Sequence, residues 1–321
     1  MRRIKYLIAI ILSLLVLSSC NSLRITNCTP IYAMDTTINI TFYNVEDYKN
    51  HYDQIKKIYQ NVDKLTGDFE DYEGQNGIYD LNVKRTIKAD ELLVDIVKSA
   101  ISMIDKTNGY YNPFMGRLTH LWKTAIKNGK LVEDETIQSE LKIIEQTSIE
   151  IKDDTITLLG DGNLDLGAIA KGYATELAQQ YLSMNKIDGY LINAGNSSLV
   201  YGSKVNDDFK IALTKPYENG NIYIILDKNN AIGTSSGRYQ HALIDGVLYH
   251  HLINPFTGYP ATTYDSVNVK TNNSILCDVY STAIMAMSLD EAINFADSEN
   301  IDIILFKDKV IYQTEGWKIY A

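Results

Sequence analysis

Residues 164–173 read Leu-Asp-Leu-Gly-Ala-Ile-Ala-Lys-Gly-Tyr, a pattern typical of a strand that gives way to a helix. We expect a strand to end at Asp165 and a helix, opened by Gly167, to cover residues 168–184. The free N–H groups in the first turn of such a helix, with an acidic residue ahead of them and Lys171 one turn in, can hold a phosphate or a metal–phosphate pair. An aspartate N-cap beside a glycine that allows close packing explains the same residues equally well. The segment is therefore a candidate phosphate site at a strand–helix junction.

The pattern of apolar residues on either side of this junction predicts a mixture of helices and strands. The other expected helices cover residues 45–65, 92–104 (closed by Gly109), 134–146, 275–287 and 289–297. The expected strands cover residues 34–43, a hairpin over 149–159 that turns at Asp153-Asp154, five or six segments across 189–271, and 301–306 and 309–313. Because no regular alternation of strand and helix appears, we predict the α+β class, with mixed or antiparallel sheets packed with helices in a single large domain over residues 34–321.

The composition is that of a chain that can bury a substantial core. It has 321 residues, of which 45% are hydrophobic and 22% charged, which excludes wholesale disorder. The formal net charge of −10 and the lack of a basic stripe argue against a nucleic-acid partner. Three cysteines cannot build a disulfide framework for a chain of this length, and neither a CxxC motif nor a histidine cluster indicates zinc.

The N-terminus has the features of an export signal. Basic residues at positions 2, 3 and 5 precede an uncharged stretch over 6–17, which is too short for a spanning helix. Leu17-Ser18-Ser19-Cys20 resembles a bacterial lipobox. We therefore predict a signal peptide over 1–19, a lipidated Cys20, a polar tether over 20–33, and a protein anchored by lipid to the extracytoplasmic face of the cell membrane. An ordinary cleaved signal or a small buried apolar helix is the alternative.

Two further stretches contain polar or ionisable residues that the packing of a hydrophobic core does not require. His250 and His251 are neighbours on an expected strand, so they point to opposite faces and at most one faces a given site. Asp278, Ser281 and Thr282 share one face of an expected helix. A carboxylate with hydroxyls on one face suits a hard cation such as Mg²⁺. Each stretch also has an explanation without function. The histidines can belong to a hairpin in which one of them is hydrogen-bonded, and Asp278, Ser281 and Thr282 can form a polar stripe on an exposed helix.

The order and spacing of these stretches resemble the ApbE family, the FAD:protein FMN transferases, over essentially the whole chain beyond the N-terminus. The fragments that carry the resemblance are Met34-Asp35-Thr36, Tyr72 with Asn82, Pro113 to Trp122, Asp165 to Tyr173, Ser235-Ser236-Gly237, His251 to Gly258, and Asp278 to Thr282. Each fragment alone is weakly specific, but seven in the right order are specific together. The chain departs from the family pattern at Asn254, where an Asp is usual, and at Asn196-Ser197, where Gly-Asp is usual.

The resemblance implies an activity and a set of site residues. The implied enzyme cleaves FAD with Mg²⁺, attaches FMN through a phosphoester bond to a threonine of an exported or membrane redox protein, and releases AMP. The resemblance implies Mg²⁺ ligands at Ala168 (through its carbonyl), Asp278, Ser281 and Thr282, and a general base at His251. The residues implied around FAD are Met34, Tyr72, Phe114, Met115, Gly116, Asp165, Lys171 and Leu252. Plain FAD hydrolysis to FMN and AMP, or flavin binding without turnover by a lipoprotein, are the alternatives that the sequence leaves open.

Overall fold

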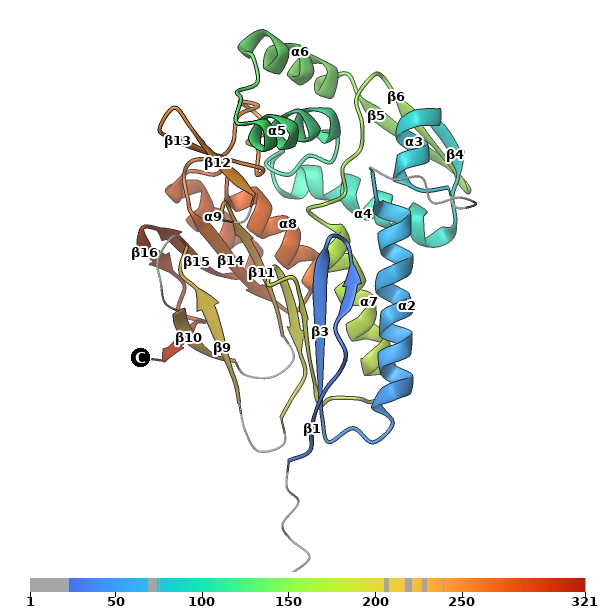
Figure 1. Ribbon diagram of the computed structural model, residues 1–321, viewed down its shortest axis with the longest axis vertical. Coiled ribbons are helices and arrows are strands. Elements are labelled where there is room, and N and C mark those ends of the chain that lie inside the picture. Colours follow the sequence, from blue (N-terminus) through green and yellow to red (C-terminus); the bar gives the residue numbers. More distant parts are fainter. Residues whose placement is uncertain are drawn as a thin grey trace, which may run out of the picture.

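An antiparallel sheet of nine strands organises the part of the chain that the structure describes (Figure 1). The structure is a computed structural model, and it describes residues 23–68, 74, 76–204, 208–216, 221–226, 230–238 and 240–320. The strand order is β1 (Ile25–Asn27), β3 (Thr36–Tyr43), β7 (Tyr190–Ala194), β8 (Ser198–Tyr201), β11 (Asn230–Ser236), β14 (Ser266–Thr271), β15 (Asp302–Lys307) and β16 (Lys309–Gln313), and β2 (Ile31–Ala33) also pairs with β3. All of these pairs are antiparallel, which confirms the predicted α+β class.

Helices cover one face of this sheet. The helices of this layer are α2 (Tyr48–Thr66), α7 (Ala170–Met184), α8 (Ser274–Ile284) and α9 (Leu289–Glu299). Helix α8 packs on β11 and β14, and α7 lies between α8 and α2 (Figure 1). Apolar residues at helical spacing drive this packing, as Ile55, Tyr59 and Val62 of α2 show by being fully buried. The main hydrophobic core therefore lies between the sheet and these helices.

A small sheet covers part of the opposite face. It consists of β9 (Phe209–Thr214), β10 (Asn221–Leu226) and β17 (Lys318–Tyr320). Phe209 and Leu213 of β9 pack with Leu199, Ile232 and Phe306 of the large sheet and form a second hydrophobic cluster. The large sheet is therefore buried on both faces along β8, β11 and β15.

The remaining elements form a cap at one end of the sheet (Figure 1). They are α3 (Ile78–Lys84), β4 (Thr86–Lys88), α4 (Glu91–Lys106), α5 (Gly116–Asn128), α6 (Asp134–Glu145), β5 (Ser148–Lys152), β6 (Thr155–Leu159) and the hairpin of β12 (His241–Ile244) and β13 (Val247–His250). Trp122 of α5 is fully buried, stacks on Tyr249 and donates its indole N–H to the Gly258 carbonyl at 2.7 Å. This contact joins the cap to the segment that follows the hairpin.

Several local expectations need correction. Helix α7 begins at Ala170 after a turn over 167–169, and no strand ends at Asp165, because Asn163 forms only an isolated bridge with Met115. Strands β1 and β2 occupy part of the predicted tether, since Ile31 and Ala33 are each only 2% exposed and belong to the sheet. Helices α3 and α5 were not expected, and the described part of 189–271 holds eight strands rather than five or six.

The other expected elements occur close to their predicted bounds. The signal peptide, Cys20 and Tyr72 lie outside the described residues. Among the described helices, none has the length and apolar character needed to cross a membrane.

Candidate active site

Helix α8 presents a buried cluster of oxygen atoms toward the sheet. Asp278 is 7% exposed, and the hydroxyl of Ser198 on β8 lies 2.6 Å from each of its carboxylate oxygens. The hydroxyl of Ser235 on β11 lies 2.9 Å from that of Ser281 and 3.2 Å from that of Thr282. The helical spacing of Asp278, Ser281 and Thr282 thus brings them together on one face, as the sequence predicts.

The charge of Asp278 is controlled by burial and by its neighbours on α7. Burial raises the pKa of Asp278 to about 6, whereas the charge of Lys171, the Ser198 hydroxyl and the backbone of Gly172 act to lower it. A side chain at position 172 would place its Cβ 2.5 Å from the Ser274 carbonyl oxygen and 3.0 Å from the Asp278 Cβ. Glycine at position 172 therefore allows α7 to approach α8 closely enough for Lys171 to act on the carboxylate.

The donor set fits a hard cation. It offers one carboxylate and the hydroxyl groups of Ser281 and Thr282, which are oxygen ligands of the kind that Mg²⁺ accepts together with water and phosphate. Within the described residues there is no group of three or more His, Cys, Asp or Glu side chains that could hold a metal. Ala168 lies in the turn that precedes α7, and its carbonyl as a further ligand stays a prediction.

The expected opposite orientation of the two histidines on one strand is wrong, because β13 ends at His250 and the centroids of the two rings lie 6.5 Å apart. Strand β13 ends at His250, which is 4% exposed and whose pKa responds to Asp265 and Lys307. His251 follows just beyond the strand, and its backbone N–H donates to the Gln240 carbonyl at 3.2 Å. Burial, and after it the neighbouring His250, lower the pKa of His251 to about 4, and the charges of Lys123 and Lys171 act in the same direction. His251 is therefore neutral at pH 7.

Two segments from different parts of the chain bring the predicted flavin residues together. The Gly116 N–H donates to the Asn163 carbonyl at 3.0 Å, and the Asp165 N–H donates to the Pro113 carbonyl at 2.8 Å. Residues 113–116, which include Phe114 and Met115, therefore run beside residues 163–165. Asn82 supports this arrangement, because its side chain donates to the Leu164 carbonyl at 2.9 Å and accepts from the Leu164 N–H at 2.8 Å.

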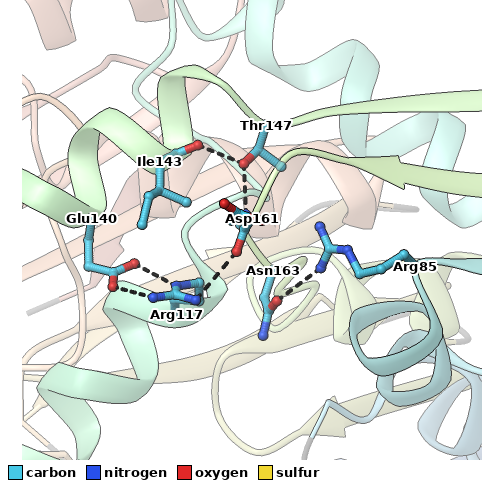
Figure 2. Close-up of polar contacts among 8 residues, drawn as sticks. Arg85, Arg117, Glu140, Ile143, Thr147, Asp161 and Asn163 are labelled. Carbon is cyan, nitrogen blue, oxygen red and sulfur yellow. Dashed lines mark hydrogen bonds and ion pairs between the residues drawn. The ribbon is translucent and has the colours of Figure 1, made fainter.

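A cavity of about 250 Å³ opens beside Gly116. Arg117 is part of the cavity wall, and its guanidinium donates two hydrogen bonds, of 2.7 and 2.8 Å, to the Glu140 carboxylate. Figure 2 shows Arg117 between Glu140 and Asp161. Asp68 also lines the cavity, and burial together with the charge of Asp165 raises its pKa to about 6. The cavity therefore continues from the predicted flavin residues toward α5 and α6.

Comparison with known proteins identifies the family. Residues 34–305 match the ApbE family. The chain belongs to the ApbE family. Relatives named FAD:protein FMN transferase include one from Treponema pallidum (strain Nichols), 24% identical over 252 residues, which are 72% of this chain and 70% of the relative. Another, from Buchnera aphidicola, is 25% identical over 294 residues, which are 86% of this chain and 84% of the relative.

Solved ApbE structures share the fold. The crystal structure of the ApbE protein of Thermotoga maritima aligns with a TM-score of 0.81 and 22% identity, covering 91% of this chain and 97% of that one. The flavin transferase ApbE of Vibrio cholerae aligns with a TM-score of 0.74 and 22% identity, covering 93% and 97%. The ApbE fold is thus present over nearly the whole chain.

The two departures from the ApbE pattern each have a local structural role. The Asn254 side chain accepts from the Phe256 N–H at 2.9 Å and donates to the Ala286 carbonyl at 3.4 Å, and an ionised Asp could not make the second bond. Asn196 adopts a left-handed backbone with φ of 57°, and it exchanges two hydrogen bonds of 2.9 Å with Asn193. Both asparagines therefore stabilise turns next to the site.

Met34 and Leu252 are the other predicted flavin residues that the structure describes. Met34 occupies the turn between β2 and β3 with a φ of 56°, and the Leu252 N–H donates to the His250 ring at 3.2 Å. Sequence reasoning missed Ser198, Asp68 and Lys123. A motif within one segment could not reveal Ser198, because it lies 80 residues from the carboxylate that it contacts.

Proposed function

We propose that this protein is a Mg²⁺-dependent FAD:protein FMN transferase. The observation that carries the proposal is the oxygen cluster of α8, in which hydroxyls of Ser198 and Ser235 on the sheet lie within 3.2 Å of the side chains of Asp278, Ser281 and Thr282. Lys171 lies on α7 next to Gly172, the residue at which α7 packs closely against Ser274 and Asp278 of α8. The membership in the ApbE family, and the relatives named FAD:protein FMN transferase, support the same activity.

Different residues of this chain would have different roles in phosphoryl transfer. Asp278, Ser281 and Thr282, with the Ala168 carbonyl, would hold Mg²⁺, which supplies charge neutralisation at the pyrophosphate when it is bound. Lys171 would hold a phosphate oxygen with its ammonium group, which lies 3.4 Å from the Gly167 carbonyl in the turn before α7. Met34, Phe114, Met115, Gly116, Asp165 and Leu252, together with Tyr72, would position FAD. Most of the rate enhancement would then come from electrostatic stabilisation of the transition state.

His251 would act as the general base. The neutral imidazole accepts the proton of the acceptor threonine hydroxyl, and the threonine oxygen forms a bond to the phosphorus of the FMN half. The bond from that phosphorus to the bridging oxygen breaks, and AMP leaves with this oxygen. The products are a threonine–FMN phosphoester and AMP, and the proton stays on His251 until solvent takes it.

The acceptor would be an exported or membrane redox protein that carries a target threonine. This part of the proposal is supported by the N-terminal sequence, in which Cys20 follows a lipobox-like segment. A lipidated Cys20 would hold the enzyme at the extracytoplasmic membrane face, where such acceptors are accessible.

Mass spectrometry tests the proposal directly. Purified protein is incubated with FAD, Mg²⁺ and candidate acceptor proteins, and both the acceptor mass and the release of AMP are followed. We expect a gain of one FMN on a threonine with one AMP released per adduct. AMP release without an adduct on any acceptor would indicate FAD hydrolysis, and flavin binding without either product would contradict an enzymatic role.

A further inference from the structure

A second hollow lies on the opposite face of the large sheet from α8. It is a crevice of about 130 Å³ between β9 and the outer face of β7, β8, β11 and β14. Figure 1 shows β9 and β10 lying over that part of the sheet. None of the residues assigned above to FAD or Mg²⁺ lines it. The crevice is therefore separate from the predicted flavin site.

One wall of the crevice carries buried polar groups. Asn268 and Ser266 on β14 are each 2% exposed, and both line the crevice. Thr234 on β11 donates to the Asn268 side-chain oxygen at 2.8 Å, and no other side-chain hydrogen bond of Asn268 is found within the described residues. A side-chain amide has two N–H donors besides its oxygen, and buried polar groups normally find partners. The amide nitrogen of Asn268 is therefore positioned to donate to a carbonyl oxygen in the crevice.

The facing wall, formed by β9, is largely apolar, although Thr214 and Arg238 also line the crevice. Ile211 and Leu213 of β9 lie across from Leu199 and Ile232 of the large sheet, at the end of the second hydrophobic cluster. A ligand here must therefore offer carbonyl groups on one side and small apolar groups on the other. An extended polypeptide has this alternation, because its successive side chains point to opposite sides of a main chain rich in carbonyl groups.

The crevice and the candidate active site meet at the ends of the same strands. Along β11, Ser235 faces the hydroxyls of Ser281 and Thr282, whereas Thr234 and Ser236 on either side of it line the crevice. In the β7–β8 connection, Asn196 lines the crevice and Ser198 contacts Asp278. One sheet thickness separates the two sites. A chain that passes over the end of β11 therefore reaches both.

We propose that this crevice binds the acceptor polypeptide beside its target threonine. The inference rests on the proposed transferase function. Asn268 donates to a main-chain carbonyl of the acceptor, and Ile211 and Leu213 contact a small side chain of the same segment. The acceptor then crosses the end of β11, and its threonine lies next to His251 and the α8 cluster. Recognition of the acceptor is thus separated from recognition of FAD by the sheet itself.

Two variants and one control test the proposal. Asn268→Asp keeps a side-chain oxygen that can accept the hydrogen bond from Thr234, but it removes the N–H donors of the amide. Ile211→Trp fills the crevice with a larger side chain from a partly exposed position. Val310→Trp is the control, because Val310 packs against the same second cluster but does not line the crevice. The probe is a pool of short peptides with one central threonine and all other positions randomised.

Two measurements are made with each protein at saturating Mg²⁺. The first is the yield of peptide–FMN adducts, with FAD affinity and acceptor-free AMP release recorded alongside. The second is retention of the peptide pool on immobilised protein without FAD, which requires no chemistry. We expect both crevice variants to lose about tenfold in adduct yield and in peptide retention, while FAD affinity and AMP release change less than about twofold and Val310→Trp matches the wild type.

The outcomes separate this inference from the proposed function. Peptides retained by the wild type but not by Ile211→Trp support the crevice even if no adduct forms, in which case the transferase proposal fails alone. Equal adduct yield or equal retention in the wild type and both crevice variants overturns the crevice assignment. A parallel loss of FAD affinity in both crevice variants also overturns it, because the crevice would then hold flavin.

Discussion

The hydroxyl of Ser198 lies 2.6 Å from both carboxylate oxygens of Asp278. Ser198 is only 1% exposed, so this contact holds the carboxylate in one orientation away from bulk water. A hydrogen bond from a neighbouring side chain that orients a metal ligand is commonly worth about 10- to 100-fold in metal affinity. Ser198 is thus a positioning residue for the candidate Mg²⁺ site.

Replacing Ser198 by alanine should therefore weaken Mg²⁺ binding by about tenfold or more. The measurement is a titration with Mn²⁺ followed by electron paramagnetic resonance, together with the Mg²⁺ concentration that gives half-maximal FAD cleavage. Ser298→Ala on α9 is the control, since it removes a serine hydrogen bond of 3.0 Å to the Phe295 carbonyl and takes no part in the oxygen cluster. Unchanged metal affinity in Ser198→Ala would show that Asp278 needs no orienting partner.

The histidine pair provides a second prediction. His251→Ala should lower the rate of FMN transfer by about 10²- to 10⁴-fold, the usual contribution of a general base, while FAD affinity changes little. His250→Ala should have little effect on catalysis and should cost about 1 kcal/mol of stability, because the His250 ring accepts the Leu252 N–H. Transfer rate, FAD affinity and thermal unfolding are measured on both variants. Equal catalytic losses would mean that the base is assigned to the wrong histidine.

Burial of His250 predicts a pH dependence of stability. His241, His251, Lys307, Asp265 and the Ala261 backbone surround the ring, and burial lowers its pKa from 6.5 to about 4. Between these two values the unfolded chain binds more protons than the folded one, so the free energy of unfolding should rise with pH, by up to about 3 kcal/mol. Urea unfolding at several pH values should show a smaller rise in His250→Gln than in the wild type. The same slope in both would contradict a buried, neutral His250.

The lipid anchor gives a prediction for the N-terminus, which lies outside the described residues. Cys20→Ser should release the protein from membranes and prevent labelling by a radioactive fatty acid, because the thiol is the attachment point for the lipid. Cell fractionation and lipid labelling of both forms provide the measurement. Wild-type protein that is entirely soluble and unlabelled would rule out the lipoprotein assignment.

The sequence predicts the fold most accurately where apolar periodicity is long. Helix α2 follows from Ile55, Tyr59 and Val62, which recur at helical spacing and are all fully buried. Helix α3 has only seven residues, which is too short for such a pattern to be distinctive. Strands β1 and β2 are three residues each and depend on pairing with β3, so local sequence gives little sign of them.

The candidate site shows the same division between local and long-range information. The shared helix face of Asp278, Ser281 and Thr282 follows from spacing alone. The alternation expected for His250 and His251 fails, because β13 ends at His250 and the two rings lie 6.5 Å apart. The contact of Ser198 with Asp278 depends on the packing of α8 against the sheet, which no local pattern specifies. The crevice beside Asn268 likewise arises only when β9 folds back over the sheet.

The cleavage of FAD by Asp278→Ala is the most direct test of the central claim, that the oxygen cluster of α8 is the catalytic centre. Wild type, Asp278→Ala and the Asp278→Ala/Thr282→Ala double variant are incubated with FAD and Mg²⁺, and AMP release is followed by chromatography while FAD binding is followed by fluorescence. We predict that Asp278→Ala and EDTA-treated wild type lose at least ~10²-fold in AMP release yet still bind FAD, and that the double variant loses little more. AMP release at the wild-type rate by Asp278→Ala, or by the EDTA-treated enzyme, would contradict the account.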